Sequence, residues 1–269
     1  DPPEAAPDPA PCDFCEGRED RTPPETYGFR PGGGEPGTSG WWVRSFSNKF
    51  PGAPFHEVVV HSPRHDARFE DLTSEHRLQI LRAYRERMSA SGRRAFVAAF
   101  NRGREAGASR SHEHSQLFGL DVVPPTLERE AEAFASDECV LCSLVTDEQL
   151  VARHGEVSVV AHPAPLLARE MLIVPGCAPR FDRATDGTLE QVGDAVADAI
   201  LRLRRVLRSH APCNLVVHVP PAGASSFHWH AHLYPRTSIP GALEVGADLP
   251  LVGVDPAESA RELRDAVSG

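Results

Sequence analysis

The hydrophobic and polar positions of this chain fall into short apolar runs and longer stretches with a helical period. The clearest helical stretch is residues 188–208, in which apolar side chains recur at steps of three and four positions. These side chains are Leu189, Val192, Val196, Ile200, Leu203 and Leu207. Thr188 and Gln191 have the spacing of a capping box, so the pattern predicts that the helix begins there. A weaker pattern predicts a second helix over about 73–88.

Four apolar runs have the composition of buried strands. Two of them precede the predicted helices and end near a proline, and the other two follow the helices. The runs lie within residues 58–65, 171–177, 96–101 and 215–219. Each half of the chain therefore reads as strand, helix, strand, strand. Helices grouped against a mostly antiparallel sheet predict an α+β fold.

A histidine-rich segment occurs twice at a constant offset. Residues 107–116 read Gly-Ala-Ser-Arg-Ser-His-Glu-His-Ser-Gln, and residues 223–232 read Gly-Ala-Ser-Ser-Phe-His-Trp-His-Ala-His, 116 positions later. Histidines two apart on a strand project to the same face, so each copy presents a row of imidazoles to one site. We expect two related halves, residues 1–125 and residues 126–269.

Composition limits the possible partners. With 269 residues, 41% of them hydrophobic, the chain is long enough to bury a sizeable core. A net charge of −10 argues against a nucleic-acid partner, which requires a basic surface. Apolar runs are too short to cross a membrane, and no signal-peptide pattern opens the chain. We expect a soluble, cytoplasmic protein with no membrane partner.

Two Cys-x-x-Cys pairs lie upstream of the two histidine rows, Cys12/Cys15 and Cys139/Cys142. Six cysteines can form three disulfides in a secreted protein, but short pairs with histidines downstream favour thiolate–imidazole zinc sites in a reducing compartment. Cys213 has no partner in this scheme and is expected to be a small buried residue.

The sequence alone limits the candidate zinc ligands to a few residues in each half. The first half offers Cys12 and Cys15, one histidine of the His61/His65 pair and one of the His112/His114 pair. Aligning residues 62–65 with 174–177 places a cysteine where His65 stands. The second set is therefore predicted to be Cys139, Cys142, Cys177 and His228. Closed four-coordinate sets of this kind are structural, since no position remains for a reacting water.

If His112 binds zinc, His114 is the next imidazole on the same face, and Gln116 follows it. A neutral imidazole beside a phosphate site can attack phosphorus and form a covalent nucleotidyl-histidine. Residues 101–109 are glycine-rich and supply backbone N–H groups for an anion. The pattern therefore indicates nucleotidyl transfer.

Six segments, residues 12–15, 20–25, 47–51, 62–65, 101–116 and 228–235, together resemble in order the galactose-1-phosphate uridylyltransferase family of the histidine-triad superfamily. Related nucleotide-sugar phosphorylases belong to the same superfamily. The resemblance implies a double displacement: a histidine attacks the α-phosphate of a nucleotide sugar, releases sugar 1-phosphate and passes the nucleotidyl group to a second acceptor.

Position by position, the resemblance makes His114 the nucleophile and Gln116 the residue that holds the transferred phosphate. The substrate contacts that it implies are Asn48 and Phe50 near the nucleoside, Asn101, Gly107 and Ser109 around the phosphates, and Glu244 at a sugar hydroxyl. It places the first zinc on Cys12, Cys15, His65 and His112. It places a second metal, zinc or iron, on Glu130, His218, His230 and His232. Two alternatives remain: Glu130 belongs to a solvated helix face, and His230/His232 are a vestigial active site. Crowding with the Cys139/Cys142 set would leave room for only one metal in the second half.

Three departures bear on specificity. Glu113 stands where the family has proline, and on a strand its side chain should point away from the His112/His114 face. The family's arginine pair ahead of the first Cys-x-x-Cys has no counterpart. Ser238-Ile239 replaces a Lys-Phe pair that grips a hexose phosphate. We expect the choice of sugar to be altered.

The resulting expectation is a homodimeric enzyme that moves UMP between sugar 1-phosphates, as in galactose metabolism, with a nucleotide sugar and a sugar 1-phosphate as its substrates. The first alternative is a phosphorylase that returns the nucleotidyl group of an ADP- or UDP-sugar to inorganic phosphate. The second is a non-catalytic, zinc-stabilised nucleotide-binding protein.

Overall fold

The computed structural model describes residues 12–136, 138–176, 180–210, 212–224 and 226–267. The strands are β1 Glu25–Phe29, β2 Val43–Ser47, β3 Phe55–Val60, β4 Ala95–Arg102, β5 His114–Leu120, β6 Leu150–His154, β7 Val157–Ala161, β8 Met171–Val174, β9 Cys213–His218 and β10 His230–Pro235. The α-helices are α1 Ser74–Ser91, α2 Pro125–Ala133, α3 Val140–Leu144, α4 Asp186–Leu207, α5 Ala242–Ala247 and α6 Pro256–Asp265.

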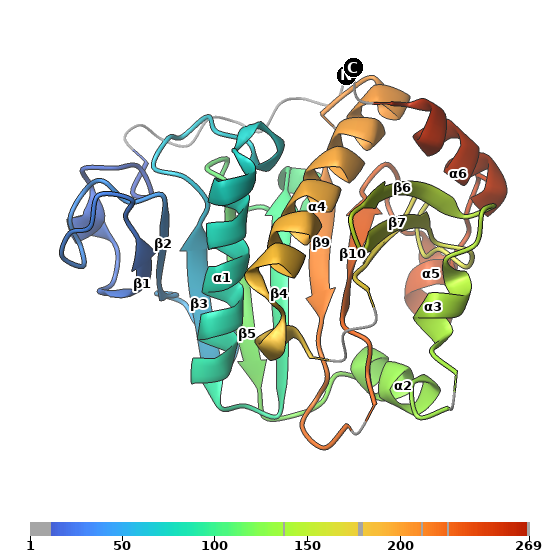
Figure 1. The fold of residues 1–269 in the computed structure, drawn as a ribbon, viewed down its shortest axis with the longest axis horizontal. Helices are drawn as coiled ribbons and strands as arrows, with labels where there is room; N and C mark the ends of the chain where they lie inside the picture. Colours follow the sequence, from blue (N-terminus) through green and yellow to red (C-terminus); the bar gives the residue numbers. More distant parts are fainter. Residues whose placement is uncertain (1–11, 137, 177–179, 211, 225, 268–269) are drawn as a thin grey trace.

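One ten-stranded sheet runs through the molecule in the order β1-β2-β3-β5-β4-β9-β10-β8-β7-β6 (Figure 1). Every pairing between described strands is antiparallel. Outward from the central β4–β9 pair, each side adds first a histidine strand, then the apolar strand that precedes a long helix, then an edge hairpin. The order is symmetric about the centre, as expected if the two halves of the chain are related. The fold is the predicted α+β class.

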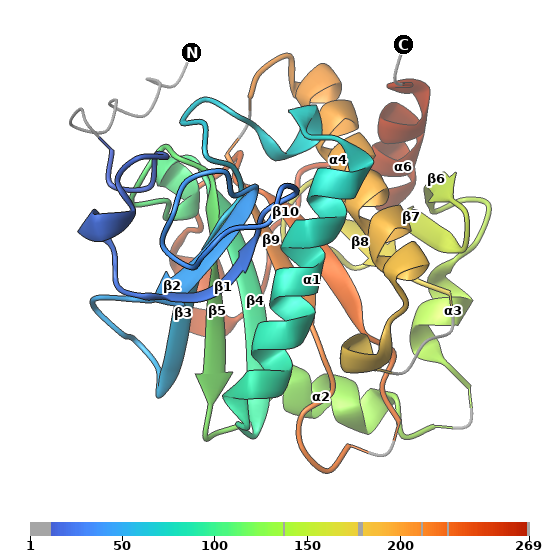
Figure 2. The same ribbon diagram turned by 60° about the vertical axis from the view of Figure 1, so that its left-hand side comes forward.

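The two long helices, α1 and α4, lie side by side across one face of the sheet (Figures 1 and 2). Their apolar sides meet inward-facing strand residues such as Phe100, Leu117 and Ile173 in the main hydrophobic core. The opposite face carries smaller apolar clusters, one of which packs Leu127 of α2 and Leu141 of α3 against β7 and β8. That opposite face also carries the histidine rows.

The predicted helices are present, with one correction at a start. Helix α1 begins after Thr73, whose hydroxyl accepts the His76 N–H, and ends at Gly92 in the left-handed conformation. Helix α4 begins earlier than predicted, because Thr185 is its N-cap and accepts the Thr188 N–H. The expected capping box at Thr188 and Gln191 is therefore wrong.

The four predicted runs overlap β3, β8, β4 and β9, and the edge hairpins β1–β2 and β6–β7 were not expected. In the described part of the chain, no helix is long and apolar enough to cross a membrane.

Candidate active site

Two cysteines and two histidines of the first half converge beside the start of β5. They are Cys12, Cys15, His65 and His112, whose ligand atoms all lie within 4.8 Å of one another. Each Sγ–Nδ1 distance recorded among them is 3.7 Å, close to the roughly 3.6 Å expected for a sulfur and a nitrogen on one tetrahedral zinc. His112 donates its Nε2 proton to the Ser62 carbonyl at 2.8 Å, which leaves the Nδ1 lone pair toward the thiols.

The other candidate from the first histidine pair, His61, has a different place. It lies on the helix side of the sheet, where its Nε2 is 2.7 Å from the Ser115 hydroxyl. Tyr84 of α1 contacts the same hydroxyl. Burial lowers the pKa of His61 well below its usual range, so the group is neutral. His65 is therefore the histidine that completes the set.

His114, the predicted nucleophile, is held in one orientation. Its Nδ1 donates to the carbonyl of His112 at 2.8 Å, so a neutral ring carries its lone pair on Nε2. The side chain is 6% exposed. The ring of Phe14, from the Cys-x-x-Cys turn, meets it edge-on with centroids 5.3 Å apart. A buried imidazole with a fixed tautomer is suited to nucleophilic attack by Nε2.

The two predicted amide residues beside His114 are each held by a partner that sequence reasoning missed. Gln116 accepts, through Oε1, from His56 Nε2 at 2.9 Å. Asn101 accepts, through Oδ1, from the Nδ2 of Asn214 at 2.8 Å, and the same nitrogen donates to the carbonyl of Ala106. Asn214 comes from the second half, so both halves hold the residues predicted to contact phosphate.

The loop between β4 and β5 contains the predicted residues Gly107 and Ser109. Gly103 and Gly107 have φ of +84° and +82°, a backbone conformation that side chains rarely adopt. A turn of 3-10 helix, Arg104–Ala106, lies between these two glycines. The loop thus packs backbone against the amide of Asn101, at the same edge as the nucleophile.

The residues predicted to contact the nucleoside lie at the β2–β3 connection. Asn48 begins this connection, and its Oδ1 accepts the N–H of Phe50 at 2.9 Å. Phe50 is 86% exposed. Phe14 and Phe46 pack edge-to-face with centroids 5.6 Å apart. These aromatic faces are suited to a nucleobase.

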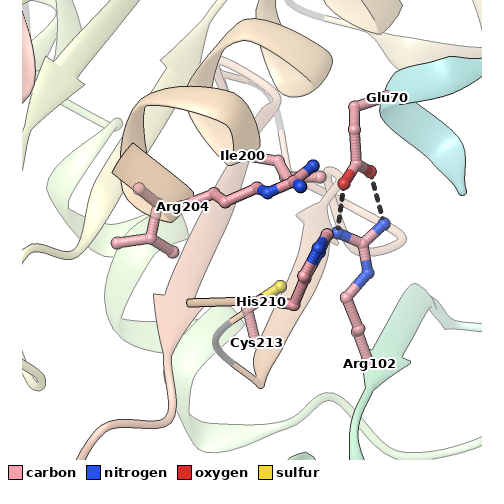
Figure 3. A pocket seen from close by; sticks show the side chains of 7 residues that line it. Glu70, Arg102, Ile200, Arg204, His210 and Cys213 are labelled. Atoms are coloured by element: carbon pink, nitrogen blue, oxygen red, sulfur yellow. Dashed lines mark hydrogen bonds and ion pairs between the residues drawn. The ribbon is translucent and has the colours of Figure 1, made fainter. Parts of the chain in front are cut away.

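Glu113 points away from the imidazole row, as predicted. Its Oε2 accepts the Phe69 N–H at 2.7 Å, and its Oε1 lies 2.7 Å from Arg102. Arg102 also makes two hydrogen bonds to Glu70, seen as dashed lines in Figure 3. All three charged side chains are buried. The network holds the nucleophile strand from behind rather than reaching the substrate.

A cavity of about 10 Å³ adjoins this network, room for about one water molecule. The residues lining it include Arg204, His210 and Cys213 (Figure 3). Burial raises the pKa of the Cys213 thiol to about 11, so this cysteine is the inert buried residue that was expected.

The second half repeats the geometry of the first around His228 and His230. His228 donates its Nε2 proton to the Pro175 carbonyl at 2.9 Å, and its Nδ1 lies 3.2 Å from the sulfur of Cys139 and 3.7 Å from that of Cys142. His230 donates its Nδ1 proton to the His228 carbonyl at 2.9 Å, as His114 does to His112. The predicted fourth ligand, Cys177, lies outside the described residues.

A second set of potential metal ligands forms beside His230. Glu130, His218, His230 and His232 place one ligand atom each within 4.8 Å of one another. Glu130 turns toward the histidines, with Oε1 2.8 Å from His218 Nδ1, so it does not belong to a solvated face. This set shares no residue with Cys139, Cys142 and His228. A further carboxylate that sequence reasoning missed, Glu170, lies 2.7 Å from His232 Nδ1.

Glu244 is the predicted substrate residue that the structure leaves apart. Its Oε2 accepts the N–H of Gly241 and caps α5. Among the described contacts it makes none with the other predicted substrate residues. Ser238 and Ile239 are exposed, Ile239 to 93%.

The sequence could have shown on which face of the sheet three of the missed residues lie: His56, Asn214 and Glu170. Each is an even number of positions from a residue on the histidine-bearing face, in its own strand or in the strand that it precedes. The partner of each side chain could not be inferred, because the pairing depends on the register between distant strands.

Comparison with known proteins shows which proteins this chain resembles. The profile of the galactose-1-phosphate uridyl transferase N-terminal domain matches residues 55–124. An ADP-glucose phosphorylase of Arabidopsis thaliana is 26% identical over 296 aligned residues, which cover 96% of this chain and 83% of that protein. An Arabidopsis thaliana ADP-glucose phosphorylase structure with bound ADP-glucose superposes with a TM-score of 0.86 at 26% identity, over 97% of this chain and 91% of that one.

Two further solved structures have the same fold. A GALT-like protein from Arabidopsis thaliana has a TM-score of 0.86 and 27% identity, over 96% of this chain and 93% of that one. A uridylyltransferase has a TM-score of 0.83 at 24% identity, over 98% of this chain and 93% of that one. Sequence motifs, the profile match over residues 55–124 and the fold all agree with the resemblance of this chain to the galactose-1-phosphate uridylyltransferase family.

Proposed function

We propose that this chain is a nucleotide-sugar phosphorylase that transfers AMP from ADP-glucose, or a closely similar ADP-sugar, to inorganic phosphate through a nucleotidyl group on His114. The observation that carries the proposal is the locked tautomer of His114. Because Nδ1 is committed to the His112 carbonyl, Nε2 is the nitrogen that attacks phosphorus. Gln116 and Asn101 flank it with carboxamides whose oxygens are already engaged.

The reaction has two balanced steps. His114 Nε2 forms a bond to the α-phosphorus of ADP-glucose as the bond from that phosphorus to the bridging oxygen breaks, and glucose 1-phosphate leaves with the electron pair. An oxygen of inorganic phosphate then attacks the same phosphorus, the P–N bond breaks, and ADP leaves. The sugar phosphate is a weakly basic leaving group, so the first step needs no general acid. Amide donors from Gln116 and Asn101 stabilise the charge on the phosphoryl oxygens.

Inorganic phosphate has more support as the acceptor of the nucleotidyl group than a second sugar phosphate. The exposed Ser238-Ile239 segment offers no cationic side chain for a hexose phosphate. The similarity to an ADP-glucose phosphorylase along 96% of the chain supports the same reading. Transfer of UMP between sugar 1-phosphates, the first expectation from sequence, has less support. It becomes one outcome of the test.

We also infer that the metal-ligand sets hold zinc. For Cys12, Cys15, His65 and His112 the support is the match of their separations to a tetrahedral site. The set around Cys139, Cys142 and His228 has the same chemistry, with Cys177 proposed as its fourth ligand. Each is a structural site, and its metal fastens a histidine strand to the preceding segment.

For Glu130, His218, His230 and His232 the support is the spacing of their ligand atoms, which all lie within 4.8 Å of one another. The Nε2 atoms of His230 and His232 lie 3.1 Å apart. Two nitrogens bound to one metal at about 2.1 Å lie roughly 3.0–3.4 Å apart, so this separation fits a shared cation. Glu130 Oε2 is buried without a hydrogen-bond partner, which fits a carboxylate ligand of zinc or iron.

The function is tested by intact-protein mass spectrometry after incubation with ADP-glucose and, separately, with UDP-glucose. We expect an AMP adduct with ADP-glucose, absent from His114→Ala and restored as turnover when His114→Gly is supplied with imidazole. The adduct is then offered inorganic phosphate, glucose 1-phosphate and galactose 1-phosphate. Fastest discharge by phosphate supports the phosphorylase, and fastest discharge of a UMP adduct by galactose 1-phosphate would assign a uridylyltransferase instead. Full activity in His114→Ala contradicts both.

The metals are tested by elemental analysis and chelation. At least one zinc per chain is expected. Chelation should lower the thermal midpoint rather than only inhibit, because binding at such a site contributes on the order of 10 kcal/mol to folding. A purified chain that folds and binds nucleotide with no metal would rule out this role.

A further inference from the structure

His56 occupies the junction between the nucleoside side and the phosphate side of the site. It lies on β3, on the same face as Val58 and Val60, whose strand pairs with β5 in register with Gln116 and His114. The side chain is 8% exposed, and its ring lies 4.3 Å from that of Phe118. No role was expected for it from the sequence.

The hydrogen bonds of His56 fix its tautomer. Its Nδ1 lies 2.9 Å from the backbone nitrogen of Gly52, which can only donate, so Nδ1 must accept. The ring proton is therefore on Nε2, and the oxygen beside Nε2 is Oε1 of Gln116 at 2.9 Å. Burial lowers the pKa of His56, which keeps the ring neutral. Gln116 thus accepts from His56, and its amide nitrogen is directed to the other side.

The same residue anchors the β2–β3 connection, residues 48–54. The carbonyl of His56 accepts the Asn48 N–H at 2.9 Å, and Asn48 in turn accepts from Phe50. The ring accepts from Gly52 at Nδ1. Asn48 Nδ2 lies 3.1 Å from Nε2, but both nitrogens carry protons, so this contact is not a hydrogen bond. His56 therefore contacts both the connection that carries the predicted nucleoside residues and the carboxamide of Gln116, the predicted phosphate contact.

We propose that His56 is a positioning residue that sets the orientation of Gln116 through Nε2 and holds the nucleoside loop through Nδ1, so that nucleoside binding and phosphoryl transfer share one support. The inference rests on the proposed function, because it takes Gln116 as the phosphate-side group and the β2–β3 connection as the nucleoside side. His56 itself does not touch the reacting atoms.

Two substitutions separate the two contacts. His56→Asn places an amide oxygen near the position of Nδ1, where it can accept from Gly52, but the side chain is too short for Gln116. His56→Gln places an amide near the position of Nε2, where it can donate to Gln116, but offers little to Gly52. His210→Asn, at an exposed histidine bordering the small cavity on the helix side of the sheet, is the matched control.

Two quantities are measured on the full chain: the single-turnover rate of nucleotidyl-histidine formation from ADP-glucose, and the Kd for AMP by calorimetry. We expect the rate of His56→Gln to lie about tenfold above that of His56→Asn, and the affinities for AMP to fall in the reverse order, also by about tenfold, as for loss of one hydrogen bond to a preorganised group. In a Gln116→Ala background, His56→Asn should cause no further loss of rate. His210→Asn should match the wild type in both.

The outcomes are distinct. A wild-type protein that forms no adduct ends the proposed function. A wild type that forms the adduct, with both His56 variants equal to it or equally impaired in rate and in affinity, overturns the role of His56. Additive losses in the Gln116→Ala background would also overturn it, since they would show that His56 acts by another route. A circular dichroism spectrum and thermal midpoint recorded for each variant separate these results from unfolding.

Discussion

At the scale of single residues, the nucleophile strand β5 assigns different roles to its two faces. His114 and Gln116 project to the site, while Ser115 contacts His61 and Tyr84 beneath the sheet. Glu113, just before the strand, projects to the same buried side. Ser115 and Glu113 are each held by buried partners, and such contacts help the strand to present an imidazole in one orientation.

Glu113 is predicted to stabilise the fold without taking part in transfer. In Glu113→Gln the amide nitrogen would face the Arg102 guanidinium, donor against donor, although Glu70 still pairs with Arg102. We expect a loss of about 1–3 kcal/mol in the free energy of unfolding. Urea denaturation measures it, with the exposed Glu128→Gln as control. Adduct formation at saturating substrate should be retained, and its loss in a folded variant would mean that Glu113 does reach the chemistry.

Asn214 is predicted to support the phosphate side from the other half of the chain. In Asn214→Asp a carboxylate oxygen would face the Asn101 oxygen and the Ala106 carbonyl, so attraction becomes repulsion. The rate of nucleotidyl-histidine formation should fall by about 10- to 100-fold, the range for a displaced preorganised group. Quenched-flow mass spectrometry measures the rate. A variant that reacts as fast as the wild type would show that Asn101 needs no such support.

The sequence was sufficient to predict those site residues whose role follows from residue type and spacing alone. Cys12, Cys15 and His65 stand at metal-ligand spacings, and His114 two positions after His112 shares its face. The supporting residues, His56 and Asn214, belong to no recognisable motif. Their contacts with Gln116 and Asn101 depend on the register between neighbouring strands. Register depends on the summed packing of the sheet, which no local pattern contains.

At the scale of elements, the contact between α1 and α4 is tied by an ion pair at the start of α4. Asp186, in the first turn, accepts from Arg82 and Arg85 of α1. These hydrogen bonds, led by Arg82, lower the pKa of Asp186 from 3.8 to about 2. The carboxylate also lies at the positive end of the helix dipole.

Asp186→Asn should therefore destabilise the protein in a pH-dependent way. The folded pKa is below the unfolded one, so the stabilisation is complete above about pH 4 and is lost as the pH falls toward 2. Because the side chain is 45% exposed, solvent screening limits the loss at pH 7 to about 0.5–1 kcal/mol. Denaturation curves of both proteins at pH 7, 4 and 2.5 give the difference. A difference that grows in acid would contradict the assignment, and Asp147→Asn is the exposed control.

Elements with strong periodicity could be predicted, and the edge hairpins could not. Helix α4 repeats its apolar residues over more than five turns, and β8 is wholly apolar, so both are evident from sequence. β1, by contrast, reads Glu-Thr-Tyr-Gly-Phe, and none of its residues is fully buried. Its position is held by pairing with β2 and by Glu25, which binds Arg30 and Arg44 across the Gly-rich connection. Strand pairing and ion pairs of this kind produce no hydrophobic pattern in the sequence of β1 itself.

At the scale of the whole molecule, the two halves of the sheet repeat the same pattern of histidine hydrogen bonds but differ in the side chains beside it. In each copy the first histidine donates to a carbonyl at the end of the neighbouring strand, and the second donates to the carbonyl of the first. Beyond the second histidine the copies diverge: Gln116 follows His114, whereas His232 follows His230. One half places a carboxamide beyond its second histidine, and the other gathers imidazoles and Glu130.

This divergence predicts one nucleotidyl group per chain. The Nε2 of His230 faces that of His232 at 3.1 Å, with a Glu130 oxygen 3.9 Å away. In the proposed metal site this nitrogen is a ligand, so it is not available to attack phosphorus even though the His230 ring is clamped like that of His114. Mass spectrometry should find a single adduct mapping to His114, absent from His114→Ala and retained by folded His230→Ala. Two adducts per chain, or one that persists in His114→Ala, would show that the second half has kept a working nucleophile.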